Sequence, residues 1–236
     1  MKVIFLFVIS SFLATDLLLA QDTITIYYDE NWEEISNKNS AIYYRKAFLD
    51  SNQVWTAYDY YISNKIQMTG TYKAKDLESK HGHFIYYYEN GQKQSEGIYI
   101  NNKNERIWTY WDEGGEIHSS GKFLKNEKEG LWKYWYTNGQ LKGEEIFKKG
   151  LINSATGYYE NGNISYKGNY MDEKKQGEWT YWNMDGRIIL KGNYNNGTKD
   201  GEWVRYFRNG DMKIYYNKGT IEGKQLGGII RSKGLL

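Results

Sequence analysis

Short runs in which aromatic or aliphatic residues alternate with polar ones fill most of the chain, and glycines divide these runs at regular intervals. Successive side chains of a strand point to opposite faces, so this alternation predicts β-strands with one apolar face. The dividing glycines are 23 or 24 residues apart, at Gly91, Gly115, Gly139, Gly162, Gly186 and Gly210. A fixed period of this length predicts an array built from one repeated supersecondary unit.

The residue before each dividing glycine predicts a tight turn. It is Asn90, Gly114, Asn138, Asn161, Asp185 or Asn209. Pairs of Asn, Asp or Gly with Gly tolerate the positive φ angles that a two-residue type I′ turn needs at both central positions. We therefore expect six β-hairpins with type I′ turns at these glycines.

Aromatic residues recur at fixed distances from the turn. Seven residues before the glycine stand Phe84, Trp108, Trp132, Ala155, Trp179 and Trp203. A type I′ register places this position opposite the residue six after the glycine, which in four units is Gly97, Gly121, Gly168 or Gly192. The same register places Gly82, Gly130 and Gly177 opposite Tyr99, Phe147 and Tyr194. A ring across a glycine compensates for the glycine's weak strand propensity, so we expect rings to cover glycines in both directions.

Polar segments separate the hairpins, and we expect them to be loops. They are residues 100–105, 124–129, 148–152, 171–176 and 195–200. The fourth unit is one residue short and has Ala155 and Gly157 where other units have aromatic residues. Asn153 replaces its first glycine. These departures predict a local irregularity or bend between Asn153 and Gly157.

The fold predicted by this pattern is all-β. Tandem antiparallel hairpins form one elongated, twisted, single-layer meander sheet. Residues 55–223 hold about seven repeats, the first being an altered unit around Asn64 and Gly70. We expect residues 21–54 to cap the array and residues 224–236 to form a C-terminal tail.

Residues 1–20 are typical of a secretory signal peptide, with Lys2 followed by apolar runs that end at Ala20. An uncleaved membrane anchor is the alternative, although Asp16 interrupts a segment that is short for a membrane span. The chain has no cysteine, which excludes a lipid anchor on a lipobox cysteine, disulfides and thiolate metal sites. We expect an exported protein of the periplasm or the cell surface.

The composition changes this picture in two ways. Lys and Arg number 31 against 29 Asp and Glu, which argues against nucleic acid as a partner. The 9 Trp, 24 Tyr and 8 Phe residues are too many for a single-layer sheet to hide, so they either cover the sheet's own backbone or line an exposed groove. The candidate binding face consists of Trp108, Tyr110, Trp132, Tyr134, Trp179, Tyr181 and Trp203.

The residues that carry chemistry form no catalytic pattern. His81 and His83 share a strand face but have no third ligand at a compatible spacing. Adjacent carboxylates such as Glu144 and Glu145 point to opposite faces of a strand, whereas paired acid and base groups must share one site. Lysine pairs such as Lys174-Lys175 are expected to be solvated turn tips. We predict no enzyme activity, no cofactor and no metal.

Two units carry a family resemblance. The runs Gly130-Leu131-Trp132-Lys133-Tyr134-Trp135 before Asn138-Gly139, and Gly177-Glu178-Trp179-Thr180-Tyr181-Trp182 before Asp185-Gly186, resemble the bacterial MORN-repeat variant. The resemblance covers residues 55–223, and it implies a β-hairpin rod that contacts proteins or membranes and has no activity of its own. Members of this group are commonly labelled YwqK-type antitoxin components.

Three functional hypotheses follow. The leading one is a non-enzymatic exported scaffold or protein-interaction module that binds another envelope protein through its aromatic face or its strand edges. The first alternative is binding of a polysaccharide, a cell wall or a lipid surface through the aromatic face. The second is an antitoxin or immunity role, which rests on the family label alone.

Overall fold

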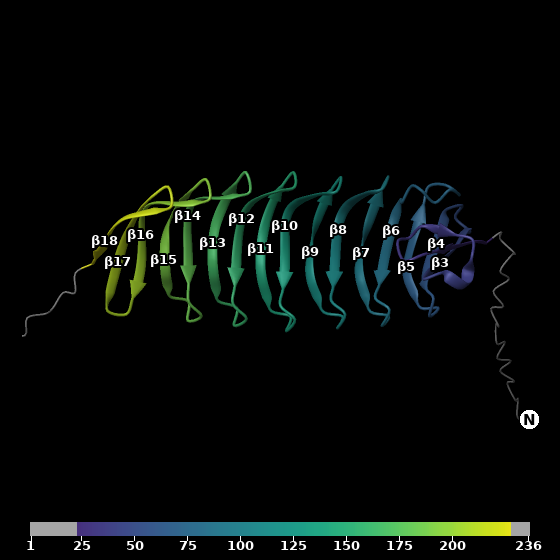
Figure 1. The fold of residues 1–236 in the computed structure, drawn as a ribbon, viewed down its shortest axis with the longest axis horizontal. Coiled ribbons are helices and arrows are strands. Elements are labelled where there is room, and N and C mark those ends of the chain that lie inside the picture. The colour runs from purple at the N-terminus through teal and green to yellow at the C-terminus, as the bar shows by residue number, and fades with distance from the viewer. Residues whose placement is uncertain (1–22, 228–236) are drawn as a thin grey trace, which may run out of the picture.

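The computed structural model describes residues 23–227 as one open antiparallel sheet of 18 strands (Figure 1). Within this range there is no α-helix, and one 3-10 turn, η1, spans Lys38–Ser40. The N-terminal strands are β1 (Ile24–Tyr28), β2 (Glu34–Ile35), β3 (Tyr43–Leu49), β4 (Trp55–Tyr61) and β5 (Ile66–Tyr72). The predicted signal peptide lies outside the described residues.

The repeats follow as hairpins of long strands. They are β6 (Gly82–Tyr87), β7 (Lys93–Ile100), β8 (Lys103–Trp111), β9 (Ile117–Leu124), β10 (Glu127–Trp135), β11 (Leu141–Lys148), β12 (Leu151–Tyr158), β13 (Ile164–Met171), β14 (Lys174–Trp182), β15 (Ile188–Asn195), β16 (Thr198–Phe207), β17 (Gly210–Asn217) and β18 (Thr220–Leu226).

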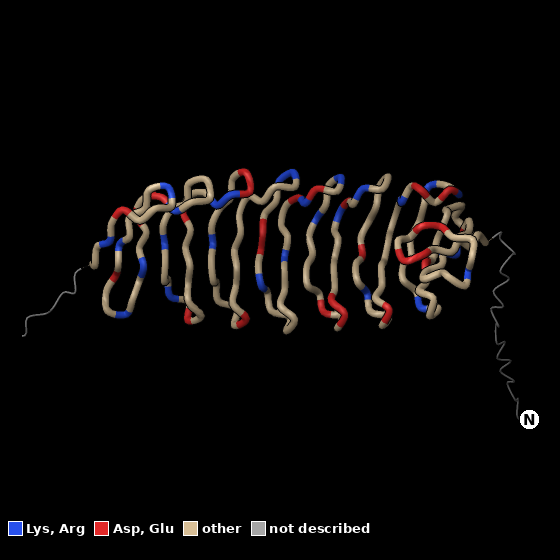
Figure 2. Tube along the Cα trace, viewed as in Figure 1, with Lys and Arg blue, Asp and Glu red and all other residues tan. Residues whose placement is uncertain are grey.

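Every strand from β3 onward pairs with the next strand in sequence, so the sheet is a meander. At the N-terminal end β1 lies between β2 and β3. Figure 1 shows the strands side by side in a long row, and Figure 2 shows acidic and basic residues along the whole length of this row. The predicted all-β hairpin meander is therefore confirmed.

The turns at the dividing glycines differ from the prediction. The Gly91 N–H donates to the Tyr88 carbonyl at 2.9 Å, and the Tyr88 N–H donates to the Gln92 carbonyl at 2.9 Å. Gly91 has a φ of 90°, whereas Asn90 does not adopt positive φ. These features define a three-residue loop that ends in a left-handed glycine, and the same bonds recur at Gly115, Gly139, Gly162 and Gly186. The prediction of type I′ turns at these glycines is wrong.

Type I′ turns occur instead at the other ends of the strands, inside the segments expected to be loops. Asn101 and Asn102 have φ of 53° and 64°, and Asp172 and Glu173 have 49° and 62°. Strands extend to within one residue of each turn, so these segments are strand ends and tight turns. Most of these turns were missed because pairs such as Asp-Glu lack the Asn-Gly signal that marks a type I′ turn.

The predicted register is nevertheless confirmed. Tyr87 pairs with Lys93 while Tyr86 pairs with Ser95, so Gln94 is an extra residue in a β-bulge. A three-residue loop followed by this bulge restores the register that a two-residue loop would produce. Phe84 lies opposite Gly97, and the corresponding pairs are Trp108 with Gly121, Trp179 with Gly192, Gly82 with Tyr99, Gly130 with Phe147 and Gly177 with Tyr194.

Each large ring covers a glycine on the strand that precedes it. A Cβ atom added to Gly121 would overlap the indole of Trp132, and the same holds for Gly97 under Trp108 and for Gly168 under Trp179. By contrast, an added Cβ at Gly130 or Gly177 would meet no atom within 4 Å. The expectation that rings cover both sets of glycines is therefore wrong for the second set. In the first set the glycines are covered, but by the ring of the following unit and not by the ring opposite them in the same hairpin. Gly130 and Gly177 have φ of 69° and 68°, so backbone geometry at a bulge explains them.

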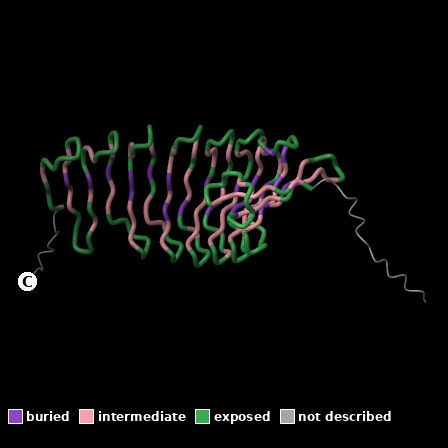
Figure 3. Tube along the Cα trace, turned by 45° about the vertical axis from the view of Figure 1, so that its right-hand side comes forward, coloured by how far each residue is buried: buried purple, intermediate pink, exposed green. Residues whose placement is uncertain are grey.

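The covered glycines let the tryptophans form a core inside a single layer. Trp108, Trp132, Trp179 and Trp203 are at most 2% exposed. Trp132 meets Phe123 edge to face at 4.9 Å, and its indole N–H donates to the Lys122 carbonyl at 3.0 Å. Figure 3 shows the buried residues as a band across the middle of successive strands. This band replaces the core that a second layer would provide.

The short fourth unit fits into the array with a smaller bulge. Ile146 pairs with Ser154 and Phe147 with Ile152, so Asn153 is one extra residue. The bulge that precedes Trp132 has two extra residues, Gly130 and Leu131. The irregularity expected at Asn153 is present, but β12 continues unbroken from Leu151 to Tyr158. The fourth unit is thus one residue shorter because its bulge has one extra residue where the unit of Trp132 has two.

Arg106 occupies the bulge position that is glycine in the units of Gly130 and Gly177, and it has a φ of 61°. A side chain in this left-handed conformation costs about 1–2 kcal/mol. We expect Arg106→Gly to raise the free energy of unfolding by about 1 kcal/mol, measured by urea denaturation. Arg106→Ala keeps the strain and is the control. Equal stability of the two variants would contradict this account.

Candidate functional site

The predicted binding face is only partly accessible. All seven of its residues lie on one face, but the four tryptophans are at most 2% exposed while Tyr110, Tyr134 and Tyr181 are half-buried. The indoles are enclosed by the sheet's own rings, as in the edge-to-face pair of Trp203 and Tyr194 at 5.0 Å. Ligand binding by this face stays a prediction, and the tyrosines are the rings that a ligand would reach.

A lysine lies over the covering ring in four units, four residues before it: Lys80, Lys128, Lys175 and Lys199. Lys175 Nζ lies 4.1 Å from the Trp179 ring centre and donates to the Tyr181 hydroxyl at 3.0 Å. A cation over an indole is stabilised by the ring's negative face. Lys175 is therefore part of the packing, and the expectation that it is a solvated turn tip is wrong.

The aromatic face is interrupted at the fourth unit. In the regular pattern Gly121 lies between Trp108 and Trp132 on the neighbouring strands. At the equivalent place Glu145 lies between Trp132 and Ala155. The glycine has become a glutamate, and the tryptophan that would cover it has become alanine. The two changes fit together, because an indole at position 155 would occupy the space of the Glu145 side chain.

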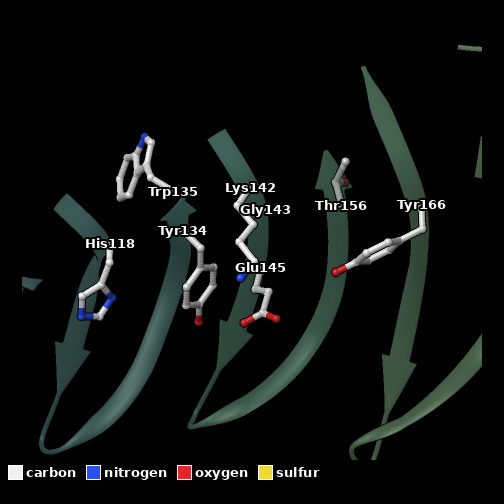
Figure 4. Close-up of a pocket in the computed structure, with 8 residues that line it drawn as sticks. All are labelled: His118, Tyr134, Trp135, Lys142, Gly143, Glu145, Thr156 and Tyr166. Carbon is white, nitrogen blue, oxygen red and sulfur yellow. The ribbon is translucent and has the colours of Figure 1, made fainter. Parts of the chain in front are cut away.

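The space left by the missing indole is a hollow of about 330 Å³. Its lining comes from five successive strands and consists of His118, Tyr134, Trp135, Lys142, Gly143, Glu145, Thr156 and Tyr166. In Figure 4 the Tyr166 hydroxyl points from β13 toward the side of the hollow where Glu145 and Tyr134 lie. An added Cβ at Gly157 would overlap the Tyr166 ring, so the absence of a side chain there lets this ring lie across β12.

The charge of Glu145 has a counter-charge in Lys128, which contacts the Tyr134 side of the hollow. Lys128 Nζ donates to the Tyr134 hydroxyl at 2.8 Å and lies 4.3 Å from the Trp132 ring centre. Burial lowers the pKa of Lys128, and the attraction of Glu145 opposes this change. Burial raises the pKa of Tyr134, and hydrogen bonding and charge from Glu145 raise it further. Lys128 and Glu145 are thus opposite charges on either side of the Tyr134 hydroxyl, and their attraction acts across it.

Metal-ligand residues do not assemble in the described part of the chain. No group of three or more His, Asp or Glu side chains between residues 23 and 227 is placed to hold a metal ion. His83 Nε2 lies 2.8 Å from Glu96 Oε1, and His118 packs against the Tyr110 ring at 6.0 Å between ring centres. No helix long and apolar enough to cross a membrane occurs in the same range.

The two ends of the sheet are built differently. At the N-terminal end β2 has two residues, and Trp32, which precedes it, stacks on Tyr43 at 4.3 Å. Arg45 and Asp59 form a buried bidentate pair there, at 2.6 and 2.8 Å. At the other end β18 pairs with β17, and six of its seven residues are exposed. Among residues 23–227 no strand covers the outer edge of β18.

Comparison with known proteins supports the family resemblance at three places. Residues 80–101, 128–149 and 154–172 match the family model described as MORN repeat variant. The second and third segments include the strands on which Tyr134, Glu145 and Tyr166 lie. No curated protein matches the chain.

Two solved structures show a distant similarity. One is titled "Crystal Structure of TcdB2-TccC3-TEV", with 12% identity and a TM-score of 0.24 over 86% of this chain and 13% of that chain. The other is titled "Crystal Structure of TcdB2-TccC3-Cdc42", with 10% identity and a TM-score of 0.23 over 85% of this chain and 14% of that chain. The protein thus spans about one-seventh of the chains that it matches.

The hollow was not predicted from the sequence, although its signal is there. Glu145 is six residues after Gly139, at the position that is glycine in four other units, and Ala155 is the one small residue in the ring position. The two positions are ten residues apart in the chain. Gly121 and Trp132, a glycine and the ring that covers it, are eleven apart, and the fourth unit is one residue short. Once the ring is known to cover the preceding strand, these exceptions point to the same place.

Asn104 stands where four other units have the lysine over the ring, and its Oδ1 atom is buried without a hydrogen-bond partner. We expect Asn104→Lys to place an ammonium group over Trp108 and within reach of Tyr110. The gain in unfolding free energy should be about 0.5–1 kcal/mol. Asn104→Met adds a chain of similar length without charge and is the control. A melting temperature that rises equally in both variants, or in neither, would show that the charge does not contribute.

Proposed function

We propose that the protein is a non-enzymatic interaction module that binds a protein partner by accepting a strand at the outer edge of β18. The open edge is the observation that carries this proposal. An unpaired edge presents main-chain donors and acceptors that an extended segment of another protein can satisfy. At the N-terminal end β2 pairs with Tyr27 and Tyr28 of β1, so among the described residues the edge left beside β1 is the short segment Ile24 to Ile26.

The geometry of β18 supports regular pairing at this edge. The Gly227 N–H donates to the Asp211 carbonyl of β17 at 2.7 Å, and Gln225 pairs with Lys213. N–H groups alternate in direction along an antiparallel strand, so those of Lys224 and Leu226 point outward. In the equivalent strand β12, residues Ser154 to Gly157 accept β13 in regular register. Residues Gly223 to Leu226 are the corresponding acceptor segment.

The burial of the indoles disfavours the main alternative. Binding of a polysaccharide along the aromatic face needs exposed ring faces in a row, whereas the tryptophans are at most 2% exposed. An extended glycan platform is thus less well supported than a strand-edge contact. Lipid binding and an antitoxin role have no specific contact that favours them.

Export is part of the proposal and rests on the sequence of residues 1–20. The partner is then another protein of the cell envelope. Mass spectrometry of the chain purified from an envelope fraction should find an N-terminus at Gln21.

Lys224→Pro tests the edge contact, because proline removes the outward N–H of β18 while the inward bonds of Gln225 and Gly227 remain. We expect capture of a partner from envelope extract to be lost with Lys224→Pro, while Lys224→Ala, which keeps the N–H, captures the same protein as the native chain. Polysaccharide and liposome fractions are scored alongside. A captured protein that is retained by Lys224→Pro, or retention of purified glycan alone, would overturn the proposal.

A further inference from the structure

The hollow at Glu145 lies on the aromatic face of β9 to β13, far along the sheet from the edge of β18 (Figure 1), so it is a second site that the strand-edge contact does not use. Its origin is specific. The array loses one covering indole and gains one carboxylate at adjacent positions, Ala155 and Glu145. Loss of the indole alone would leave an apolar gap over a glycine at position 145, whereas the carboxylate of Glu145 makes the gap polar.

The charge of the hollow argues for a neutral ligand. Glu145 is balanced by Lys128 through the Tyr134 hydroxyl, which accepts from Lys128 at 2.8 Å. Lys128 also occupies the faces of Trp132, Tyr134 and Phe147, at 4.3, 5.3 and 4.8 Å from their ring centres. The place where a ligand's cation would find ring faces is therefore taken by a resident lysine. An anionic ligand would face the carboxylate of Glu145.

The remaining groups suit a ring that carries hydroxyls. The Glu145 carboxylate accepts hydrogen bonds, and the Tyr166 hydroxyl both donates and accepts. The ring of Tyr166 supplies an aromatic wall, and Tyr134, which Lys128 covers on one face, lies on the other side of the Glu145 carboxylate. Aromatic faces are electron-rich and attract the weakly positive C–H groups of a sugar ring, while the carboxylate binds its hydroxyls. A volume of about 330 Å³ is at the small end of ligand sites, which fits one or two sugar rings.

We propose that the hollow at Glu145 is a binding site for a neutral saccharide unit. Glu145 accepts hydrogen bonds from vicinal hydroxyls of the sugar, and Tyr134 and Tyr166 contact its ring. Lys142, which is exposed at the rim, donates to a further hydroxyl. The site recognises one short glycan end and not a long chain, because the neighbouring units close the face with their indoles.

The test uses the full chain and three neutral probes: methyl β-D-glucopyranoside, maltotriose and chitotriose. Nα-acetyl-lysine amide serves as the cationic probe. Binding is followed by NMR through the ring signals of Tyr134 and Tyr166. We expect at least one neutral probe to shift these signals, with an affinity that falls about tenfold in Glu145→Gln, and we expect no shift from the lysine amide.

Two further variants make the result specific. Glu145→Gly combined with Ala155→Trp restores the pattern of the neighbouring units, so it should keep the fold and lose the sugar-dependent shifts. Glu144→Gln removes a carboxylate from the opposite face, where Glu144 pairs with Lys133 at 3.5 Å, and should bind as the native chain does.

Failure of all three sugars to shift the Tyr134 and Tyr166 signals would overturn the proposal. So would shifts of equal size in Glu145→Gln, which keeps the native shape and serves if the double variant does not fold. Tighter binding of the lysine amide would mean that the hollow takes a basic side chain. Lys224→Pro should leave sugar binding unchanged, so the two proposals fail separately.

Discussion

The contact of an indole with a glycine on the preceding strand is the interaction on which the rest of this structure depends. A single-layer sheet has no second layer to bury its side chains against, so the core must form within the layer. Glycine provides the space for this, because an indole can lie flat on a strand only where no Cβ atom intervenes. The edge-to-face rings of Tyr99, Phe123, Tyr170 and Tyr194 then close the sides of each indole. A lysine covers the remaining face of Trp132, Trp179 and Trp203.

The same constraint explains the candidate sites. Where every unit keeps its glycine and its indole, the face is closed and offers a ligand only tyrosine edges. The hollow exists because Glu145 and Ala155 change both partners of one contact together. Among residues 23–227 the outer edge of β18 is unpaired for a different reason, because each strand of a meander pairs only with its neighbours in sequence.

The sequence predicts the architecture and the strand register well, because both follow from the period of the glycines and the parity of the aromatic positions. It predicts the turns poorly. Asn-Gly fits a type I′ turn and also a three-residue loop with a left-handed glycine, and a bulge at Gln94 makes the two registers identical. The true type I′ turns at Asp172-Glu173 and Lys125-Asn126 each carry a glutamate or a lysine, which rarely adopts positive φ, so these pairs lack the Asn-Gly signal.

The candidate site was partly within reach of the sequence. The fourth unit was identifiable as exceptional from Ala155 and Gly157, but not as a hollow, since that requires knowing which neighbouring strand the ring covers. The register places Trp179 between Gly168 on the preceding strand and Gly192 on the following strand. The direction of the side chain determines that the indole covers Gly168. The role of Lys128 and Lys175 was missed for a similar reason, because four residues of separation in a strand give no hint of contact across a bulge.

The most direct test of the central claim is a double-mutant cycle at Gly168 and Trp179, measured as the free energy of unfolding in urea. A Cβ atom at position 168 would overlap the indole of Trp179. Gly168→Ala should therefore destabilise the native chain by about 1–3 kcal/mol. It should cost little in a chain that already carries Trp179→Ala, because the clash is then removed. An equal cost in both backgrounds would contradict the account, since glycine would then be required for a reason other than the ring that covers it.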